Sequence, residues 1–187
     1  RNYQKEYSEV LGHMDLKMRD KTALVAAASK GLGKATAMAL AGEGCRVAIC
    51  ARDQEQLSAA AEDIQSETGE KVLDVVCNLT DKESIAQMFK TVNSSLDGID
   101  ILVVNSGGPP VVPFSELTDE HWLEAYQSTH LSAVRLLNHA LPSMQERNWG
   151  RVIAIESSSV KQPVAGLHLS NGIRAGVYKK SNSRFQI

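Results

Sequence analysis

The sequence predicts an α/β protein with a doubly wound parallel sheet that helices cover on both faces. Two observations predict this class. Five short apolar runs recur along the chain, and longer segments with helical signals separate them. The apolar runs are continuous rather than alternating, which is typical of strands buried on both faces. Strand–helix–strand units of this length build a three-layer αβα sheet of the Rossmann type.

The first unit spans the N-terminal third of the chain. The short apolar run Thr22–Ala28 predicts a buried strand, and Ser29–Gly33 predicts a tight turn. The Ala-rich segment Lys34–Gly44 predicts a helix. A second strand is expected over Arg46–Cys50. These elements together form the first strand–helix–strand crossover.

The second unit begins at Asp53, which we expect to cap a helix that ends near Gly69. A third strand is expected over Lys71–Cys77. Thr80 and Glu83 have the spacing of a capping box, which predicts a helix that runs to about Leu96. This pattern repeats the strand–helix alternation of the first unit.

The last predicted unit begins with a fourth strand over Ile99–Val104. Thr118 is expected to cap one long helix, because acidic residues follow it in the first turn. That helix should run to about Arg147, and a fifth strand is expected over Arg151–Ser157. Five strands and their crossovers therefore account for most of the chain.

Composition excludes several classes of protein. The 187 residues, 43% of them hydrophobic and 22% charged, suffice for one domain with a buried core. A net charge of −2 gives no basic field for nucleic acid, and no apolar run approaches the roughly 18–20 residues that span a membrane. Cys45, Cys50 and Cys77 form no CxxC pair, so we expect buried free thiols, no metal site and a cytoplasmic location.

The turn after the first strand carries a nucleotide-binding signal. Gly31 and Gly33 stand where the chain leaves the strand and enters a helix. Missing side chains let the backbone approach a pyrophosphate, and the helix N-terminus offers N–H groups to the anion. The alternative is a helix-entry turn that needs small residues only for packing. The glycines alone do not separate these two interpretations.

The order of the motifs resembles the short-chain dehydrogenase/reductase family, particularly its bacterial 3-oxoacyl-acyl-carrier-protein reductases, over about residues 17–177. Ala26 and Ala27 take the places of Thr and the first Gly in the family's Thr-Gly-x-x-x-Gly-x-Gly turn. Val104 followed by Asn105-Ser106-Gly107 resembles Asn-Asn-Ala-Gly, and the segment from Trp149 to Ile153, followed by Ser157, resembles the fifth strand. The resemblance implies an NADP(H)-dependent oxidoreductase for a small carbonyl or alcohol substrate, forming a homodimer or homotetramer.

The resemblance also implies a set of cofactor-binding residues. These residues lie in the Gly-rich turn, at the ends of the second and third strands and after the fourth strand. They are Ala27, Ser29, Lys30, Gly31, Leu32, Gly33, Arg52, Asn78, Leu79, Asn105, Ser106 and Gly107. Lys30 and Arg52 could together neutralise the 2′-phosphate of NADP, since no carboxylate occurs before Asp53 at the end of the second strand. Alternatively, both are ordinary surface cations.

The catalytic positions depart from the family pattern of Ser, Tyr, Lys and Asn. Ser157 matches the Ser, whereas Ser170 replaces the Tyr, Arg174 the Lys and His130 the Asn. A serine hydroxyl is a far weaker acid than a phenol. The proton could therefore come from His130 or His168, or from a water held by Ser157 and Ser170. If Glu156 is buried near Ser157, we expect it to pair with Arg174.

The two ends of the chain also differ from the family pattern. We expect residues 1–13 to be a leader or extension, and residues 14–187 to form a single dinucleotide-binding domain. Residues 178–187 are an atypical polar tail where the family continues a long helix and further strands, which suggests a truncation or reading-frame change. Two other hypotheses therefore stay open: a dinucleotide-binding or assembly protein without catalysis, and an inactive truncated product.

Overall fold

Five parallel strands form one sheet in the order β3-β2-β1-β4-β5. The computed structural model describes residues 16–182, with side chains over residues 16–177, so the expected leader and the end of the tail lie outside the described residues. The strands are β1 (Thr22–Val25), β2 (Arg46–Ala51), β3 (Val72–Val76), β4 (Ile101–Val104) and β5 (Arg151–Ala154). Every neighbouring pair is parallel, which confirms the predicted fold class. The strand order reverses direction between β1 and β4, and ligands bind at such a point in open α/β sheets.

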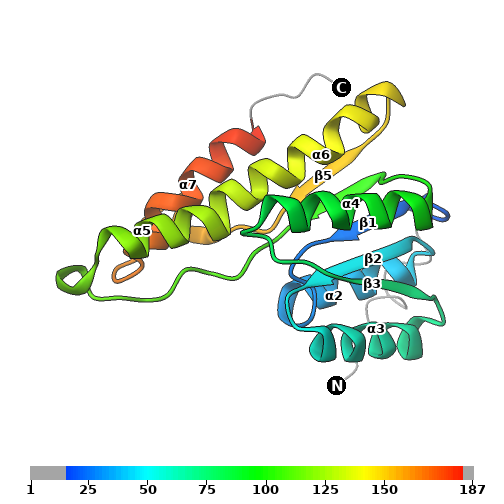
Figure 1. Ribbon diagram of the computed structural model, residues 1–187, viewed down its shortest axis with the longest axis horizontal. Coiled ribbons are helices and arrows are strands. Elements are labelled where there is room, and N and C mark those ends of the chain that lie inside the picture. Colours follow the sequence, from blue (N-terminus) through cyan, green and yellow to red (C-terminus); the bar gives the residue numbers. More distant parts are fainter. Residues whose placement is uncertain (1–15, 183–187) are drawn as a thin grey trace.

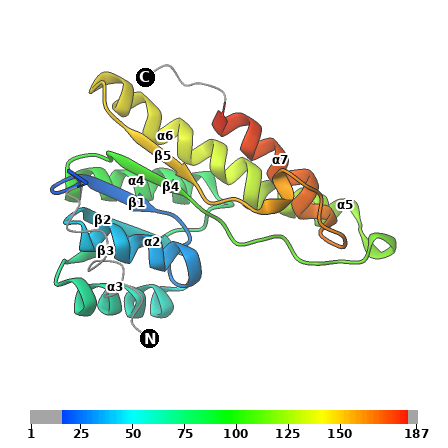
Figure 2. The same cartoon turned by 180° about the vertical axis from the view of Figure 1, so that it is seen from behind.

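The helices form layers on the two faces of the sheet (Figures 1 and 2). The α-helices are α2 (Gly31–Gly42), α3 (Gln54–Thr68), α4 (Lys82–Leu96), α5 (Asp119–Ala125), α6 (Ser132–Glu146) and α7 (His168–Asn182). Helices α2 and α3 lie on one face, and α4 and α6 lie on the other. The remaining elements are the 3₁₀ turns η1 (Phe114–Glu116) and η3 (Ser158–Val160), and the π-helix η2 (Tyr126–Leu131).

Each strand contributes side chains to two cores. Leu24 belongs to the cluster that also contains Ile85 of α4 and Leu136 of α6. Its neighbour Val25 belongs to the opposite cluster, with Leu57 of α3. Successive side chains of a strand point to opposite faces of the sheet. A sheet with helices on both faces therefore needs apolar residues at nearly every strand position. This requirement explains the continuous apolar runs of the sequence.

The predicted helix ends are partly confirmed. Asp53 caps α3, because its carboxylate accepts from the Gln56 N–H at 2.9 Å, and Gly69 ends that helix in a left-handed conformation. The predicted cap of α4 is wrong by one residue. Asp81 is the N-cap and accepts from the Glu83 N–H at 2.9 Å, whereas the Thr80 hydroxyl donates to Asn78 at 2.9 Å. The Asp81 carboxylate, rather than the Thr80 hydroxyl, therefore accepts from the start of this helix.

The long helix predicted after Thr118 is interrupted. Thr118 does precede α5, and its N–H donates to Nδ1 of His121 at 3.2 Å. However, the helix turns into η2 before α6 begins, and α6 ends at Glu146. Helix α2 begins at Gly31 rather than Lys34. The helix α7 continues to Asn182, into the segment that we expected to be an atypical tail.

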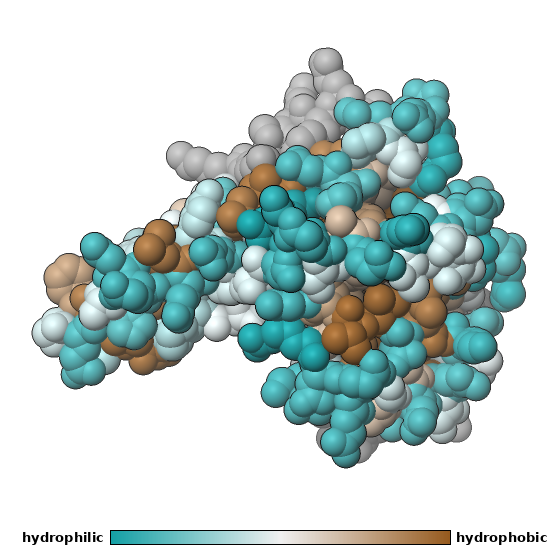
Figure 3. Space-filling view, viewed as in Figure 1, coloured by the Kyte–Doolittle hydropathy of each residue, from teal (hydrophilic) through white to brown (hydrophobic). Residues whose placement is uncertain are grey.

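The edges of the sheet are partly exposed. Strand β3 forms one edge, and Figure 3 shows apolar surface over it, between α4 and α3. Val76 at its end is exposed. Strand β5 forms the other edge of the described sheet, and its Ile153 is also exposed. Unpaired strand edges with apolar side chains favour association with another chain.

Candidate active site

A cleft of about 1150 Å³ opens at the carboxyl ends of the strands. All of the predicted cofactor-binding residues line this cleft except Gly31 and Gly33, which belong to the Gly-rich turn. The lining members of that set are Ala27, Ser29, Lys30, Leu32, Arg52, Asn78, Leu79, Asn105, Ser106 and Gly107. The structure therefore brings together residues from four separate loops. The position matches the reversal of strand order between β1 and β4.

The Gly-rich turn packs closely against the loop that follows β4. A Cβ on Gly33 would lie 2.6 Å from the carbonyl oxygen of Ala27, so only glycine fits there. The Asn105 side-chain amide donates to the carbonyl oxygens of Ala26 and Ala27, at 3.2 Å each. Gly31 has φ 59° and Ala27 has φ 49°, so Ala27 occupies a conformation that favours glycine. The turn is thus held in place by the loop that follows β4.

The start of α2 lacks a capping hydrogen bond from the side chain of its N-cap residue, Lys30. The first turn also contains no acidic residue. The first N–H groups of a helix need acceptors, and they carry a partial positive charge. The helix therefore offers these donors to an anion at the cleft.

Two cations lie at the β2 side of the cleft. Lys30 and Arg52 are both exposed and both line it. The nearest carboxylate, Asp53, accepts hydrogen bonds from both the backbone and the side-chain amide of Gln56. Lys30, Arg52 and Asp53 therefore all line this side of the cleft, and the Asp53 carboxylate also caps α3.

The loop after β3 is held rigidly. Asn78 Oδ1 accepts from the Thr80 N–H at 3.1 Å, and Arg135 of α6 donates to the Thr80 carbonyl oxygen at 2.7 Å.

Cys77 lines the cleft just before this loop. A hydrogen bond from Cys50 lowers the pKa of the Cys77 thiol, and the same contact together with burial raises the pKa of Cys50. All three cysteines are free and buried, as predicted.

Part of the lining could not be found from the sequence. The Gly107–Pro110 loop after β4 lines one side of the cleft. The opposite wall comes from α5 and η2, through Glu124, Ala125, Gln127 and Ser128. No motif marks these residues. They reach the cleft because of the path of the helix, which sequence periodicity alone does not give.

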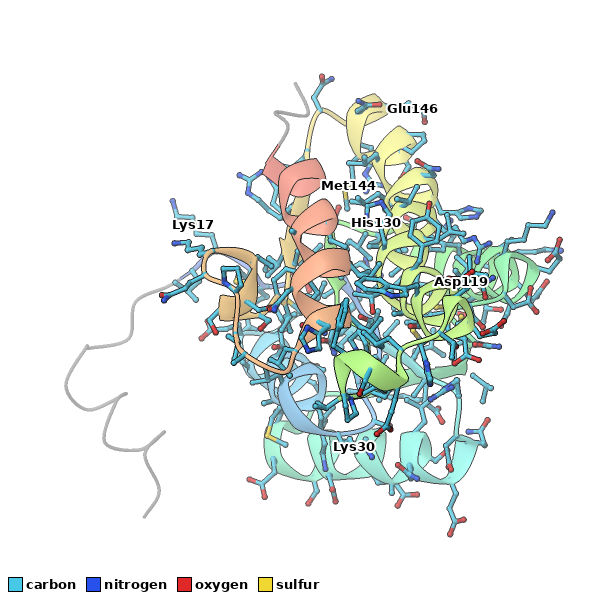
Figure 4. All side chains as sticks on the ribbon, turned by 90° about the vertical axis from the view of Figure 1, so that its left-hand side faces the viewer. Lys17, Lys30, Asp119, His130, Met144 and Glu146 are labelled. Carbon is cyan, nitrogen blue, oxygen red and sulfur yellow. The ribbon has the colours of Figure 1, made fainter. Side chains whose placement is uncertain are left out.

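The four predicted catalytic residues lie beyond this lining. Ser157 Oγ accepts from the Ser159 N–H at 3.1 Å, and the Ser159 and Ser170 hydroxyls lie 3.3 Å apart. The structure therefore gathers Ser157 and Ser170 around Ser159. His130 stacks on Tyr126 with ring centroids 5.2 Å apart. Figure 4 shows His130 beside α7 and Lys30 beside α2, well apart from each other.

The expected pairing of Glu156 with Arg174 is confirmed. Glu156 Oε2 accepts from Arg174 Nη1 at 3.1 Å, and both side chains are almost fully buried. A Cβ on Gly108 would lie 3.8 Å from Arg174 Nη2, so the guanidinium lies directly behind the cleft wall. The other candidate proton donor, His168, packs edge-on against Phe114 at 5.3 Å. The cleft and the serine cluster thus meet at Gly108 and Arg174.

Comparison with known proteins identifies the family. The family model described as short chain dehydrogenase matches residues 21–170. The chain belongs to the short-chain dehydrogenase family. A 3-oxoacyl-acyl-carrier-protein reductase of Aquifex aeolicus is 33% identical over 144 residues, which cover 77% of this chain and 58% of that relative. The chain thus spans little more than half of the relative's length.

Solved structures of this family are similar over most of the chain. An L-sorbose reductase from Gluconobacter frateurii, complexed with NADPH and L-sorbose, has a TM-score of 0.86 and 30% identity, covering 90% of this chain and 64% of its own. An NADPH-bound short-chain oxidoreductase from Pseudomonas aeruginosa, described as containing an atypical catalytic center, has a TM-score of 0.81 and 30% identity, covering 86% and 63%. Among the described residues, no helix is long and apolar enough to cross a membrane.

Proposed function

We propose that this chain is an NADP(H)-dependent oxidoreductase that reduces a carbonyl substrate or oxidises the corresponding alcohol. The observation that carries this proposal is the cleft at the carboxyl ends of the strands, closed below by the Gly-rich turn. Membership of the short-chain dehydrogenase family supports oxidoreductase chemistry. The 3-oxoacyl reductase relative supports a 3-oxoacyl-like compound as one substrate class.

The described residues fit a dinucleotide. The absence of a Cβ at Gly33 and the N-terminus of α2, which lacks a side-chain cap, suit a pyrophosphate. Lys30 and Arg52 suit the 2′-phosphate of NADP, because the guanidinium offers a planar fork of donors. An NAD-specific site places a carboxylate at the end of the second strand for the ribose hydroxyls, whereas Arg52 stands directly after β2 here and Asp53 caps α3. These features favour NADP(H) over NAD(H).

The bound dinucleotide would supply the hydride of the reaction. Arg174, behind Gly108, would bind ribose hydroxyls at the nicotinamide end, and Ser157 would donate a hydrogen bond to the substrate oxygen. The cluster of Ser157, Ser159 and Ser170 would hold the water that gives the proton. The alternative donor is His130, whose ring nitrogens can donate a proton.

The test is turnover by the full chain. We expect loss of NADPH absorbance with at least one member of a panel of ketones and aldehydes, including a 3-oxoacyl thioester. Ser157→Ala should lower kcat by about a hundredfold, whereas Ser158→Ala, at the exposed neighbouring position, should leave it unchanged. Saturable binding of NADPH without turnover on any substrate would instead favour a dinucleotide-binding protein without catalysis.

A further inference from the structure

Glu156 is a buried carboxylate in a place where the catalytic scheme above gives it no task. It follows β5 and immediately precedes Ser157, and its side chain is only 11% exposed. Its partner Arg174, on α7, has a side chain that is 10% exposed. Burying two charges costs several kcal/mol of desolvation for each ion, so such a pair is weak evidence for stability alone. A specific role in the site would explain its presence.

The geometry gives the two ends of the guanidinium different neighbours. Nη1 donates a hydrogen bond to Oε2 of Glu156 at 3.1 Å. Nη2 faces the Gly108 backbone, where even a Cβ would remain 3.8 Å away. Gly108 lines the cleft. Because the guanidinium is planar, fixing Nη1 also fixes the direction of Nη2.

The charged groups that face Glu156 come from two elements. Arg174 approaches from α7, and His130 approaches from η2. Both lower the pKa of the Glu156 carboxyl, but burial raises it by more, so that it stands above the ordinary value near 4.5. Glu156 therefore takes up a proton at a higher pH than an exposed glutamate does. Protonation weakens the charge-assisted hydrogen bond to Arg174.

We propose that Glu156 is a positioning residue that holds Arg174 against the Gly108 wall, where Arg174 binds the nicotinamide half of the dinucleotide. This inference rests on the proposed function, because it assumes that the cleft binds NADPH. The carboxylate itself does not touch the ligand. Removing it would leave Arg174 free to turn away from Gly108, and would weaken only the interactions at that end of the cleft.

The test compares two ligands on the full chain by calorimetry. NADPH fills both halves of the cleft, whereas adenosine 2′,5′-bisphosphate has no nicotinamide half. Glu156→Gln should weaken NADPH binding about tenfold, the value of one charge-assisted hydrogen bond, and should leave bisphosphate binding unchanged. Glu156→Asp should retain part of the affinity. Glu62→Gln, which removes an exposed carboxylate of α3 outside the cleft, is the matched control.

The pH dependence gives a second readout. As the pH is lowered from neutrality, the ratio of NADPH affinity to bisphosphate affinity should fall in the native chain relative to Glu156→Gln, because Glu156 takes up a proton at a higher pH than an exposed glutamate does. The ratio cancels the titration of the 2′-phosphate, which both ligands carry. The slope in Glu156→Gln gives the contribution of the bisphosphate's 5′-phosphate, which NADPH lacks and which titrates by itself. A native slope equal to that of the variant would overturn the proposal.

A charge exchange separates positioning from a merely structural role. In the double variant Glu156→Arg with Arg174→Glu, the pair can reform and support folding, but a carboxylate then faces Gly108. We expect a thermal midpoint closer to the native one than that of Glu156→Gln, without recovery of NADPH affinity. Recovered NADPH affinity would overturn the proposal. If the native chain binds neither ligand, the proposed function itself is wrong, and this inference is wrong with it.

Discussion

Ala27 shows how a single residue limits the Gly-rich turn. Its φ of 49° lies in the left-handed region, and its side chain lines the cleft. A residue with a Cβ pays about 1–2 kcal/mol in this conformation. The sequence showed that Ala27 stands in the place of a glycine, and the structure shows that the backbone has kept the conformation that glycine would adopt.

This strain leads to a stability prediction. Ala27→Gly should raise the free energy of unfolding by about 1 kcal/mol, because glycine accepts positive φ without a steric cost. Urea denaturation followed by circular dichroism would measure the change. Ala28→Gly is the control, since Ala28 is fully buried and is not among the positive-φ residues, and it should destabilise the chain. A destabilised Ala27→Gly variant would show that the strain is not real.

The proposed role of Lys30 and Arg52 in the choice between the two dinucleotides can be tested by substitution. Replacing both with Gln should weaken NADPH binding at least tenfold, because two charge-assisted contacts to the 2′-phosphate are lost. NADH binding should change little, since NADH has no such phosphate. Lys82→Gln, an exposed lysine at the start of α4, is the control. Equal losses for both dinucleotides would show that these cations contact something other than the 2′-phosphate.

At the level of elements, the start of α4 offers a clear comparison between adjacent residues. Asp81→Ala should destabilise the chain by about 1 kcal/mol, because its carboxylate caps the helix. Thr80→Ala should cost less, because the Thr80 hydroxyl bonds only to the exposed Asn78 side chain. Both changes can be measured by urea denaturation. A larger loss for Thr80→Ala would support the capping box that the sequence suggested.

The strands and the cleft could be predicted from the sequence because they depend on local patterns. Continuous apolar runs gave all five strands, and the Gly-rich turn located the cleft. The interruption of the long helix by η2 could not be predicted in this way. Within the described residues, the buried Thr129 hydroxyl of this π-helix has no hydrogen-bond partner, and a buried hydroxyl without a partner is unfavourable. The wall built by Glu124 and Ser128 follows from that same path.

The candidate site also combines contacts that could be predicted from the sequence with contacts that could not. The expected contact between Glu156 and Arg174 was inferred from the cost of burying a charge near Ser157, and the structure confirms it. The gathering of Ser159 with Ser170 depends on how η3 meets α7. Such long-range packing leaves no periodic signal in the sequence.

At the level of the whole molecule, the exposed apolar side chains predict self-association. Phe114 of η1 is 72% exposed, and Leu123 of α5 is 60% exposed. Helix α5 lies at the projecting end of the molecule in Figure 1. We expect a dimer or tetramer in sedimentation velocity at micromolar concentration. Leu123→Glu should shift the chain towards monomer, whereas Ala86→Glu, at an exposed position of α4, should not. A monomer at every concentration would contradict this prediction.

The central claim is that the cleft binds NADPH. The most direct measurement is a calorimetric titration of the full chain with NADPH, and with NADH as the comparison. The account predicts saturable binding at one site for each chain, with NADPH bound at least tenfold more tightly than NADH. Absence of heat and of saturation for both dinucleotides would contradict it, because the Gly-rich turn and the two cations would then have no ligand.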